Sequence, residues 1–193
     1  MKKILIILMC VAFAKTASAQ KDSLSFDEHN KYIYYHVVDQ PGSIVDTLQT
    51  RALYFLKTAY PGIKVNKSST PANITGNGIF LVYSSTAIVK TQDGQISYTC
   101  NIECKDQKYR YWLTNFVYTP YKTDRYGNSV PEPGSDVALE NTKKLDKKQA
   151  DNYLNQAGAF SKQFGDKLKQ YMLKISAAPP KEVKKKVINT KDW

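Results

Sequence analysis

The sequence predicts an α+β domain in which an antiparallel sheet of about five strands carries two helices on one of its faces. Three observations lead to this prediction. Several segments alternate apolar and polar side chains and are rich in aromatic and β-branched residues. Two longer segments repeat apolar residues at helical spacing, and Pro, Gly, Asn and Asp separate most of these segments. The predicted order along the chain is β-α-β-β-β-β-α.

The first strand is predicted over Tyr32 to Val38 because of its aromatic and β-branched composition. The pair Pro41-Gly42 ends this strand. Ser43, with an acidic residue three positions later, resembles a capping box that opens the first helix. One buried helix stripe follows from apolar residues at helical spacing, namely Ile44, Leu48, Ala52, Phe55 and Ala59.

The middle of the chain predicts a short strand over Ile63 to Lys67 and further strand structure over Asn73 to Tyr83. The second stretch contains Gly76-Asn77-Gly78. An Asn-Gly pair between apolar runs is a hairpin signal, but one long strand with a glycine bulge also fits the pattern.

Alternation from Ile96 to Cys104 predicts a half-buried strand with Cys100 and Cys104 on its apolar face. Four residues along a strand span roughly 13 Å, whereas a disulfide needs Cα atoms within roughly 7 Å. The two cysteines are therefore expected not to pair with each other. Buried free thiols are the favoured interpretation over a redox or metal-binding role, because no histidine stands at ligand spacing beside them.

A tight turn at Lys105 to Lys108 leads into a long aromatic strand, Tyr109 to Tyr121, and loops are predicted over Lys122 to Lys144. The last element is a long helix from Lys147 to about Ile175. Its buried stripe comprises Ala150, Leu154, Ala157, Phe160, Phe164, Leu168, Tyr171 or Met172, and Ile175. Glycine weakens a helix by about 1 kcal/mol relative to alanine, so Gly158 and Gly165 suggest close packing.

The first 19 residues have the pattern of a bacterial signal peptide. Lys2 and Lys3 precede an apolar run, and Ala17-Ser18-Ala19 is a small-residue cleavage site. A lipoprotein signal at Cys10 fits less well. The chain is thus expected to be exported, to the periplasm or beyond, without a transmembrane segment. We expect a frayed stretch at 20–30, one domain over 31–176 and a basic, disordered tail over 177–193.

Charge is unevenly distributed along the 193 residues, whose formal net charge is +11. Residues 20–140 are neutral, whereas residues 141–193 carry +8. This excess lies on the last helix and the tail, which include Lys184, Lys185 and Lys186. Electrostatic association with anionic lipid or acidic polysaccharide of the cell envelope is one hypothesis, and an ordinary solvated face is the alternative.

Several local motifs resemble a family of secreted bacterial proteins of unknown function with a fold like that of the TATA-binding protein (TBP). The motifs are Val37-Val38 followed by Pro41-Gly42-Ser43, Gly76-x-Gly78, the turn Lys105-Asp106-Gln107-Lys108, Tyr109-Arg110-Tyr111 and Asn115-Phe116. The resemblance covers roughly residues 30–175. It implies a curved sheet with helices on the convex side, an open concave face, and one curved strand around Gly76.

The fold name suggests nucleic-acid binding, but the charge distribution argues against it. Phosphate neutralisation requires Lys and Arg on the contacting face, and here the strands belong to a neutral body. We therefore expect no nucleic-acid partner.

No catalytic arrangement is recognisable in the sequence. Only His29 and His36 are suited to acid–base chemistry near neutral pH, and no nucleophile, phosphate-loop or zinc motif is present. We expect neither enzyme activity nor a cofactor or metal, and an enzyme of unfamiliar type is the lesser alternative.

The strand face that points away from the helices is the candidate binding surface. If Ile33, Tyr35 and Val37 point inward, the first strand exposes its other side chains, and the same argument applies to the strand beginning at Tyr109. The resulting open-face candidates are Tyr32, Tyr34, His36, Arg110, Trp112, Thr114, Phe116 and Tyr118. Exposed aromatic rings stack on sugars or anchor proteins, so a glycan or protein partner is expected. The alternatives are that the tail or a second copy covers them, or that a one-residue bulge exchanges the two faces.

Overall fold

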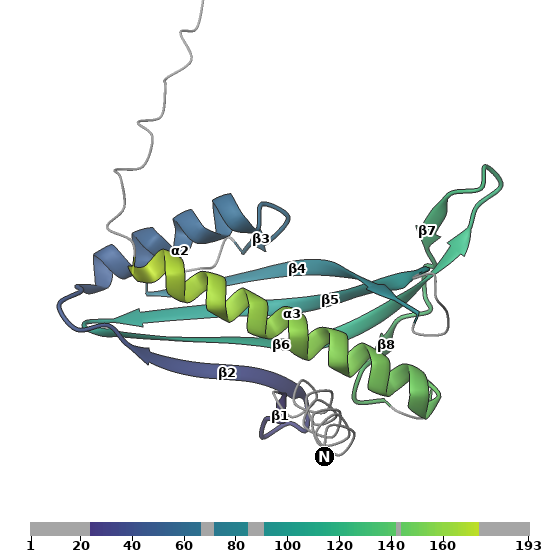
Figure 1. Ribbon diagram of the computed structural model, residues 1–193, viewed down its shortest axis with the longest axis horizontal. Coiled ribbons are helices and arrows are strands. Elements are labelled where there is room, and N and C mark those ends of the chain that lie inside the picture. Colours follow the sequence, from purple (N-terminus) through teal and green to yellow (C-terminus); the bar gives the residue numbers. More distant parts are fainter. Residues whose placement is uncertain (1–23, 67–71, 85–90, 142–143, 174–193) are drawn as a thin grey trace, which may run out of the picture.

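The protein is described by a computed structural model that defines residues 24–66, 72–84, 91–141 and 144–173. These residues form one antiparallel sheet and two helices (Figure 1). The strands are β1 (Ser25–Phe26), β2 (Tyr32–Asp39), β3 (Lys64–Val65), β4 (Asn73–Tyr83), β5 (Gln92–Lys105), β6 (Lys108–Thr123), β7 (Ser129–Pro131) and β8 (Val137–Ala138). The helices are α2 (Val45–Ala59) and α3 (Lys147–Leu173).

The sheet has the strand order β1-β2-β6-β5-β4-β3, and β7 and β8 both pair with β6. All pairings are antiparallel, so the α+β prediction is confirmed. Eight strands replace the expected five or so, because β1, β7 and β8 are pairings of two or three residues that alternation cannot reveal. β7 and β8 lie in the segment that was expected to be loops.

The stretch 24–30 is more ordered than the predicted fraying. β1 pairs with the start of β2, and the Phe26 ring lies 4.5 Å from the Tyr32 ring. Asp27 fixes the intervening turn, since its Oδ1 accepts hydrogen bonds from the backbone N–H groups of His29 and Lys31. These contacts explain why the expectation of fraying was wrong for this part of the chain.

Gly76 and Gly78 lie inside the single strand β4, so a long strand, and not a hairpin, is present here. The register with β5 is continuous through both glycines, and the predicted glycine bulge is absent from this position. The glycines serve close packing instead. A Cβ on Gly76 would lie 2.7 Å from Ile63 Cγ2, and one on Gly78 would lie 2.5 Å from the Tyr98 hydroxyl.

Helix α2 begins differently from the capping-box prediction. Ile44 is the N-cap residue and makes no side-chain cap; the Asp106 carboxylate of the β5–β6 turn instead accepts the Val45 N–H at 2.9 Å. Ile44 is 60% exposed and does not belong to the buried stripe. The stripe starts at Leu48 and continues through Ala52 and Phe55, as predicted.

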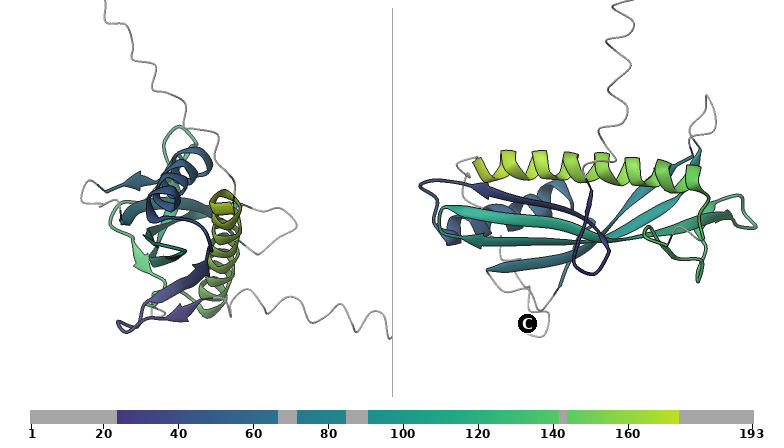
Figure 2. Two further views of the ribbon diagram at one scale, coloured as in Figure 1. Left: turned by 90° about the vertical axis from the view of Figure 1, so that its left-hand side faces the viewer. Right: turned by 90° about the horizontal axis from the view of Figure 1, so that it is seen from below.

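Both helices cover the same face of the sheet (Figure 2), and α3 runs diagonally across it. The strand residues that alternate toward the helices form the core, including Ile74, Val82, Ile96, Ile102 and Leu113. No helix in the described parts of the chain is both long and apolar enough to cross a membrane.

Gly165 lets α3 approach the sheet closely. A Cβ at this position would overlap the hydroxyl and ring of Tyr111, a β6 residue whose side chain is fully buried. The close packing expected from the sequence is thus confirmed at Gly165. Glycine lowers the helix propensity here, but it allows α3 to contact a large aromatic ring.

We predict that Gly165→Ala destabilises the protein, although alanine is the better helix former. The propensity gain is about 1 kcal/mol, whereas overpacking costs about 1 to 3 kcal/mol. Urea unfolding followed by circular dichroism measures the net loss. Tyr111→Phe removes the overlapping hydroxyl and should reduce the effect of Gly165→Ala; equal destabilisation in both backgrounds would contradict this account.

Candidate functional site

Strand β2 presents the opposite side chains from those expected. Tyr34 is 5% exposed and lies 6.3 Å from the Tyr111 ring, and the half-buried His36 stacks on Tyr111 at 5.7 Å. These two residues, together with the half-buried Tyr32, face the helices. Tyr35 and Val37 are 46% and 54% exposed and lie on the open face instead. The predicted orientation was wrong because both sides of this strand are apolar or aromatic, so alternation does not fix its phase.

A β-bulge in β6 explains why two further open-face candidates, Phe116 and Tyr118, do not lie on the open face. Ser97 pairs with Val117 and Thr99 pairs with Thr114, so Asn115 and Phe116 together oppose the single residue Tyr98. Asn115 has φ of +54°, a left-handed conformation that asparagine adopts more readily than most residues.

Beyond the bulge, the side chains of β6 exchange faces. Phe116 is fully buried, and Tyr118 is 5% exposed with its ring 4.3 Å from that of Tyr153 on α3. Both belong to the core rather than to the open face. Arg110 and Trp112 precede the bulge and lie on the open face as predicted, and Thr114 is 9% exposed.

The open face brings Tyr35, Arg110 and Trp112 together, and we call these three residues the aromatic platform. The Tyr35 and Trp112 rings are 6.3 Å apart, and the Arg110 guanidinium lies 5.5 Å from the centre of the Trp112 ring. Glu103 holds Arg110 in place, since its Oε2 accepts from Nε at 2.6 Å. Hydrogen bonds to Glu103 and then to Tyr35 raise the pKa of Arg110, so its charge is permanent.

A row of amide and hydroxyl side chains crosses the open face beside the platform. Thr75 donates to Asn101 at 2.9 Å, Thr99 donates to Asn77 at 3.2 Å, and Asn115 donates to Thr99 at 3.3 Å. The Lys31 ammonium continues the row by donating to Asn115 Oδ1 at 2.6 Å. Sequence reasoning missed this row because it depends on the register of three strands and on the bulge at Asn115.

A depression of about 1080 Å³ lies where the platform meets the turn after β1. Its lining includes the platform residues Tyr35, Arg110 and Trp112, and the depression extends around the edge of β2 to Tyr34, His36 and Lys162 of α3. The other lining residues named here are Phe26, Glu28, His29, Lys31 and Asn115. The depression therefore combines flat rings with hydrogen-bond donors and acceptors, which is the composition of a ligand site.

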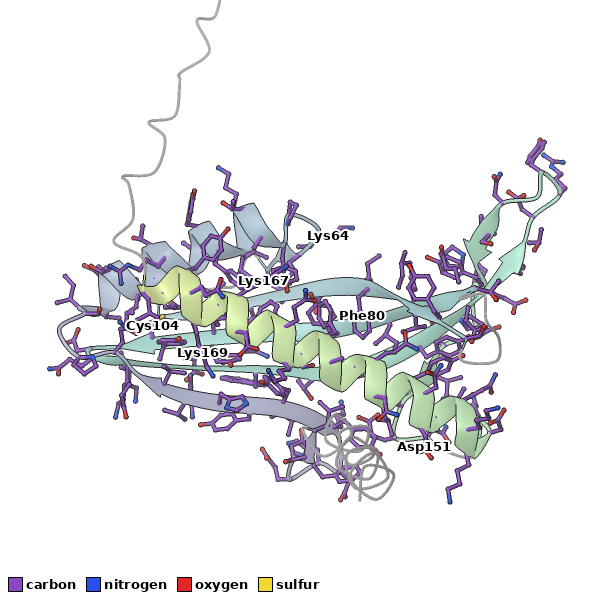
Figure 3. The ribbon with its side chains drawn as sticks, in the orientation of Figure 1. Lys64, Phe80, Cys104, Asp151, Lys167 and Lys169 are labelled. Atoms are coloured by element: carbon purple, nitrogen blue, oxygen red, sulfur yellow. The ribbon has the colours of Figure 1, made fainter. Side chains whose placement is uncertain are left out.

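The two cysteines lie on the helix-covered face, as predicted, and both are free and buried. Cys104 lies beneath the C-terminal part of α3 (Figure 3). Burial raises the pKa of Cys104 to about 11 and that of Cys100 further, so both remain thiols at neutral pH. Within the described residues, no three His, Cys, Asp or Glu side chains gather in a way that would hold a metal.

His36 lies between the sheet and α3, where charged groups surround it. Burial is the main factor that lowers its pKa; Lys169 lowers it further, and Asp166 acts in the opposite direction. Lys169 extends from the side of α3 that faces β2, whereas Lys167 lies on the opposite side (Figure 3), with its Nζ 5.5 Å from the Tyr60 ring. Tyr34, Tyr111 and Lys162 complete the neighbouring groups.

We predict that the protein loses stability as the pH falls through the ordinary histidine value near 6.5. The lowered folded-state pKa means that the unfolded chain takes up the proton first, which favours unfolding below that value. Urea midpoints measured between about pH 5.5 and 7.5 should show this slope, and His36→Phe should flatten it. His29→Gln is the matched control at the exposed histidine; an unchanged slope in His36→Phe would contradict the assignment.

The single antiparallel sheet with both helices on one face places the protein in the α+β class. Residues 34–119 match a family described as a domain of unknown function (DUF4468) with TBP-like fold. The resemblance to a family of unknown function with a TBP-like fold, inferred from the sequence, is confirmed over these residues.

Two crystal structures share the fold at low sequence identity. One is a TBP-like protein from Parabacteroides distasonis, with 15% identity, a TM-score of 0.58, and coverage of 77% of this chain and 96% of that one. The other is a DUF4468 family protein from Bacteroides ovatus, with 12% identity, a TM-score of 0.54, and coverage of 81% and 94%. No curated protein is significantly similar to the chain. The similarity therefore establishes the fold and leaves the function to the site.

Proposed function

We propose that this protein is an exported, non-catalytic binding module that holds its ligand on the aromatic platform and in the adjoining depression. The observation that carries the proposal is the pairing of Tyr35 with Trp112 on a sheet face that neither helix covers. Tyr35 is 46% exposed, although a buried position would gain more from the hydrophobic effect. Exposed aromatic residues on a rigid sheet are typical of recognition surfaces.

A saccharide is the ligand class that fits these groups best. Flat aromatic rings pack against the apolar face of a sugar ring, while amide, hydroxyl and guanidinium groups bond its hydroxyls. Trp112 supplies such a ring, and Arg110, Asn115 and Lys31 supply polar groups around the same depression. A peptide with an aromatic or acidic side chain is the second ligand class to be tested.

Nucleic acid fits this surface less well. Arg110 is already neutralised by Glu103, at 2.5 Å between Nη2 and Oε2, and Lys31 lies in the same region as Asp27 and Glu28. Affinity for nucleic acid depends on several unpaired cations that contact phosphates. The second hypothesis from the sequence is association of the lysine-rich C-terminal helix and tail with an anionic envelope surface. The tail part, with Lys184, Lys185 and Lys186, lies outside the described residues.

We predict that Trp112→Ala and Tyr35→Ala each weaken ligand binding at least about tenfold, because truncation of a central aromatic anchor commonly costs more than 1.4 kcal/mol. An array of envelope glycans and a peptide library would identify the ligand, and calorimetry would then measure the affinity. Leu53→Ala is the matched control, since Leu53 is 47% exposed on α2, on the other side of the sheet. Binding that survives both platform substitutions would refute the proposed site.

Export is predicted to remove the first 19 residues, so that the mature chain begins at Gln20. N-terminal sequencing of the protein from cell fractions would measure this directly. Ala17→Asp or Ala19→Asp should block cleavage, because the cleavage site requires small residues, whereas Lys21→Gln should not affect it. Recovery of the uncleaved chain in the cytoplasm would contradict the export part of the proposal.

A further inference from the structure

The outer edge of β2 lacks the protection that edge strands in natural proteins usually carry. β1 covers only Tyr32 and Ile33, and beyond them no hydrogen bond from a described residue reaches the outer backbone of Tyr34 to Asp39. These six residues extend over about 20 Å. The strand from Tyr32 to Val38 contains no lysine, proline, glycine or bulge, which are the usual means of preventing edge-to-edge pairing.

The opposite edge of the sheet differs, because other parts of the chain occupy it. β3 pairs with Gly76 and Asn77 of β4, and the Asn66 N–H donates to the Thr75 carbonyl at 2.8 Å. At the far end of β4, α3 satisfies the backbone of Tyr83 through two side chains, Gln156 and Asn152. Gly78 to Val82 of β4 also have no backbone partner on this side among the described residues, but β3 and α3 bound this stretch at both ends, whereas the β2 edge is open from Tyr34 to Asp39.

We propose that the β2 edge pairs with the same edge of a second copy, which forms an antiparallel dimer with a continuous sheet. The strand is self-complementary. The segment Tyr34 to Val38 has an outer backbone unpaired by any described residue, carries no charged side chain and is centred on His36. A twofold axis at His36 therefore places Tyr35 opposite Val37 of the second copy. Tyr34 then lies opposite Val38 on the helix-covered side. Aromatic and β-branched residues form favourable cross-strand pairs, and no like charges oppose each other in this register.

The dimer also has a consequence for the open face. Tyr35 and Val37 are both exposed on that face, so the pairing brings the two aromatic platforms to the same side of one extended sheet. A second copy satisfies the outer backbone groups of β2, which a monomer leaves in water, and the Tyr35 rings remain on the open face.

Sedimentation velocity and light scattering on the chain from Gln20 to Trp193 test the proposal over the micromolar concentration range. A reversible monomer–dimer equilibrium is expected. Val37→Lys introduces the charge that protects natural edge strands and should raise the dissociation constant at least about tenfold. Ile79→Lys is the matched control on β4, because Ile79 is 58% exposed against 54% for Val37 and lies on the same face. Circular dichroism and urea midpoints show whether each variant retains the monomer fold.

Cysteine substitutions test the register. Directly opposed residues in an antiparallel pair have Cα atoms about 4.5 to 5.5 Å apart, a separation that a disulfide can bridge. A mixture of Tyr35→Cys and Val37→Cys chains should therefore cross-link far more than either variant alone. The native thiols do not interfere, since Cys100 and Cys104 are buried.

Three results would overturn the proposal: a chain that is monomeric at every concentration, a dimer that resists Val37→Lys, or a dimer that Ile79→Lys dissociates. Dimerisation that appears only after removal of residues 174–193 would overturn it as well, because the chain's own tail would then occupy the edge. Failure here is distinguishable from failure of the proposed function, since a monomeric Val37→Lys chain keeps Tyr35, Arg110 and Trp112 for ligand-binding assays.

Discussion

The close packing of α3 on the sheet is the constraint from which the rest of the architecture follows. Tyr111 projects from β6 against Gly165, and on neighbouring strands Tyr98 projects against Gly78. Each glycine lacks the Cβ that would collide with the tyrosine, so a large aromatic side chain fits where two backbones come close. Tyr118 and Tyr153 add a stacked pair near the N-terminal end of α3. The helix is thereby fixed along its length on one face.

Because both helices are committed to that face, the other face of the sheet has no covering element among the described residues. The aromatic residues of β2 and β6 divide between these two environments. Those facing the helices contribute to core stability, and those on the open face, Tyr35 and Trp112, lie beside Arg110, which Glu103 holds in place. The same strand can thus contribute to the core and present exposed aromatic side chains on the other face, since successive side chains point in opposite directions.

The sequence was sufficient for the helices, for the central strands and for the burial of both cysteines, because in those segments one period dominates. Ile96 to Cys104 alternates without interruption, and α3 keeps its apolar spacing from Ala150 to Met172. The sequence was insufficient to predict which side chains form the candidate site. In β2 every position from Tyr32 to Val38 is compatible with burial, so the choice of face required knowledge of which residues meet Tyr111.

The bulge at Asn115 shows why the remaining error was unavoidable from pattern alone. Without it, Phe116 and Tyr118 would continue on the face of Trp112, and the open face would carry a long aromatic row on β6 without the Asn115 amide. With it, those two rings enter the core, while Asn115 connects Lys31 to Thr99 across three elements. One inserted residue therefore both completes the core and supplies the polar part of the depression. A bulge between a core segment and the proposed binding segment is consistent with the general tendency of bulges to re-aim side chains.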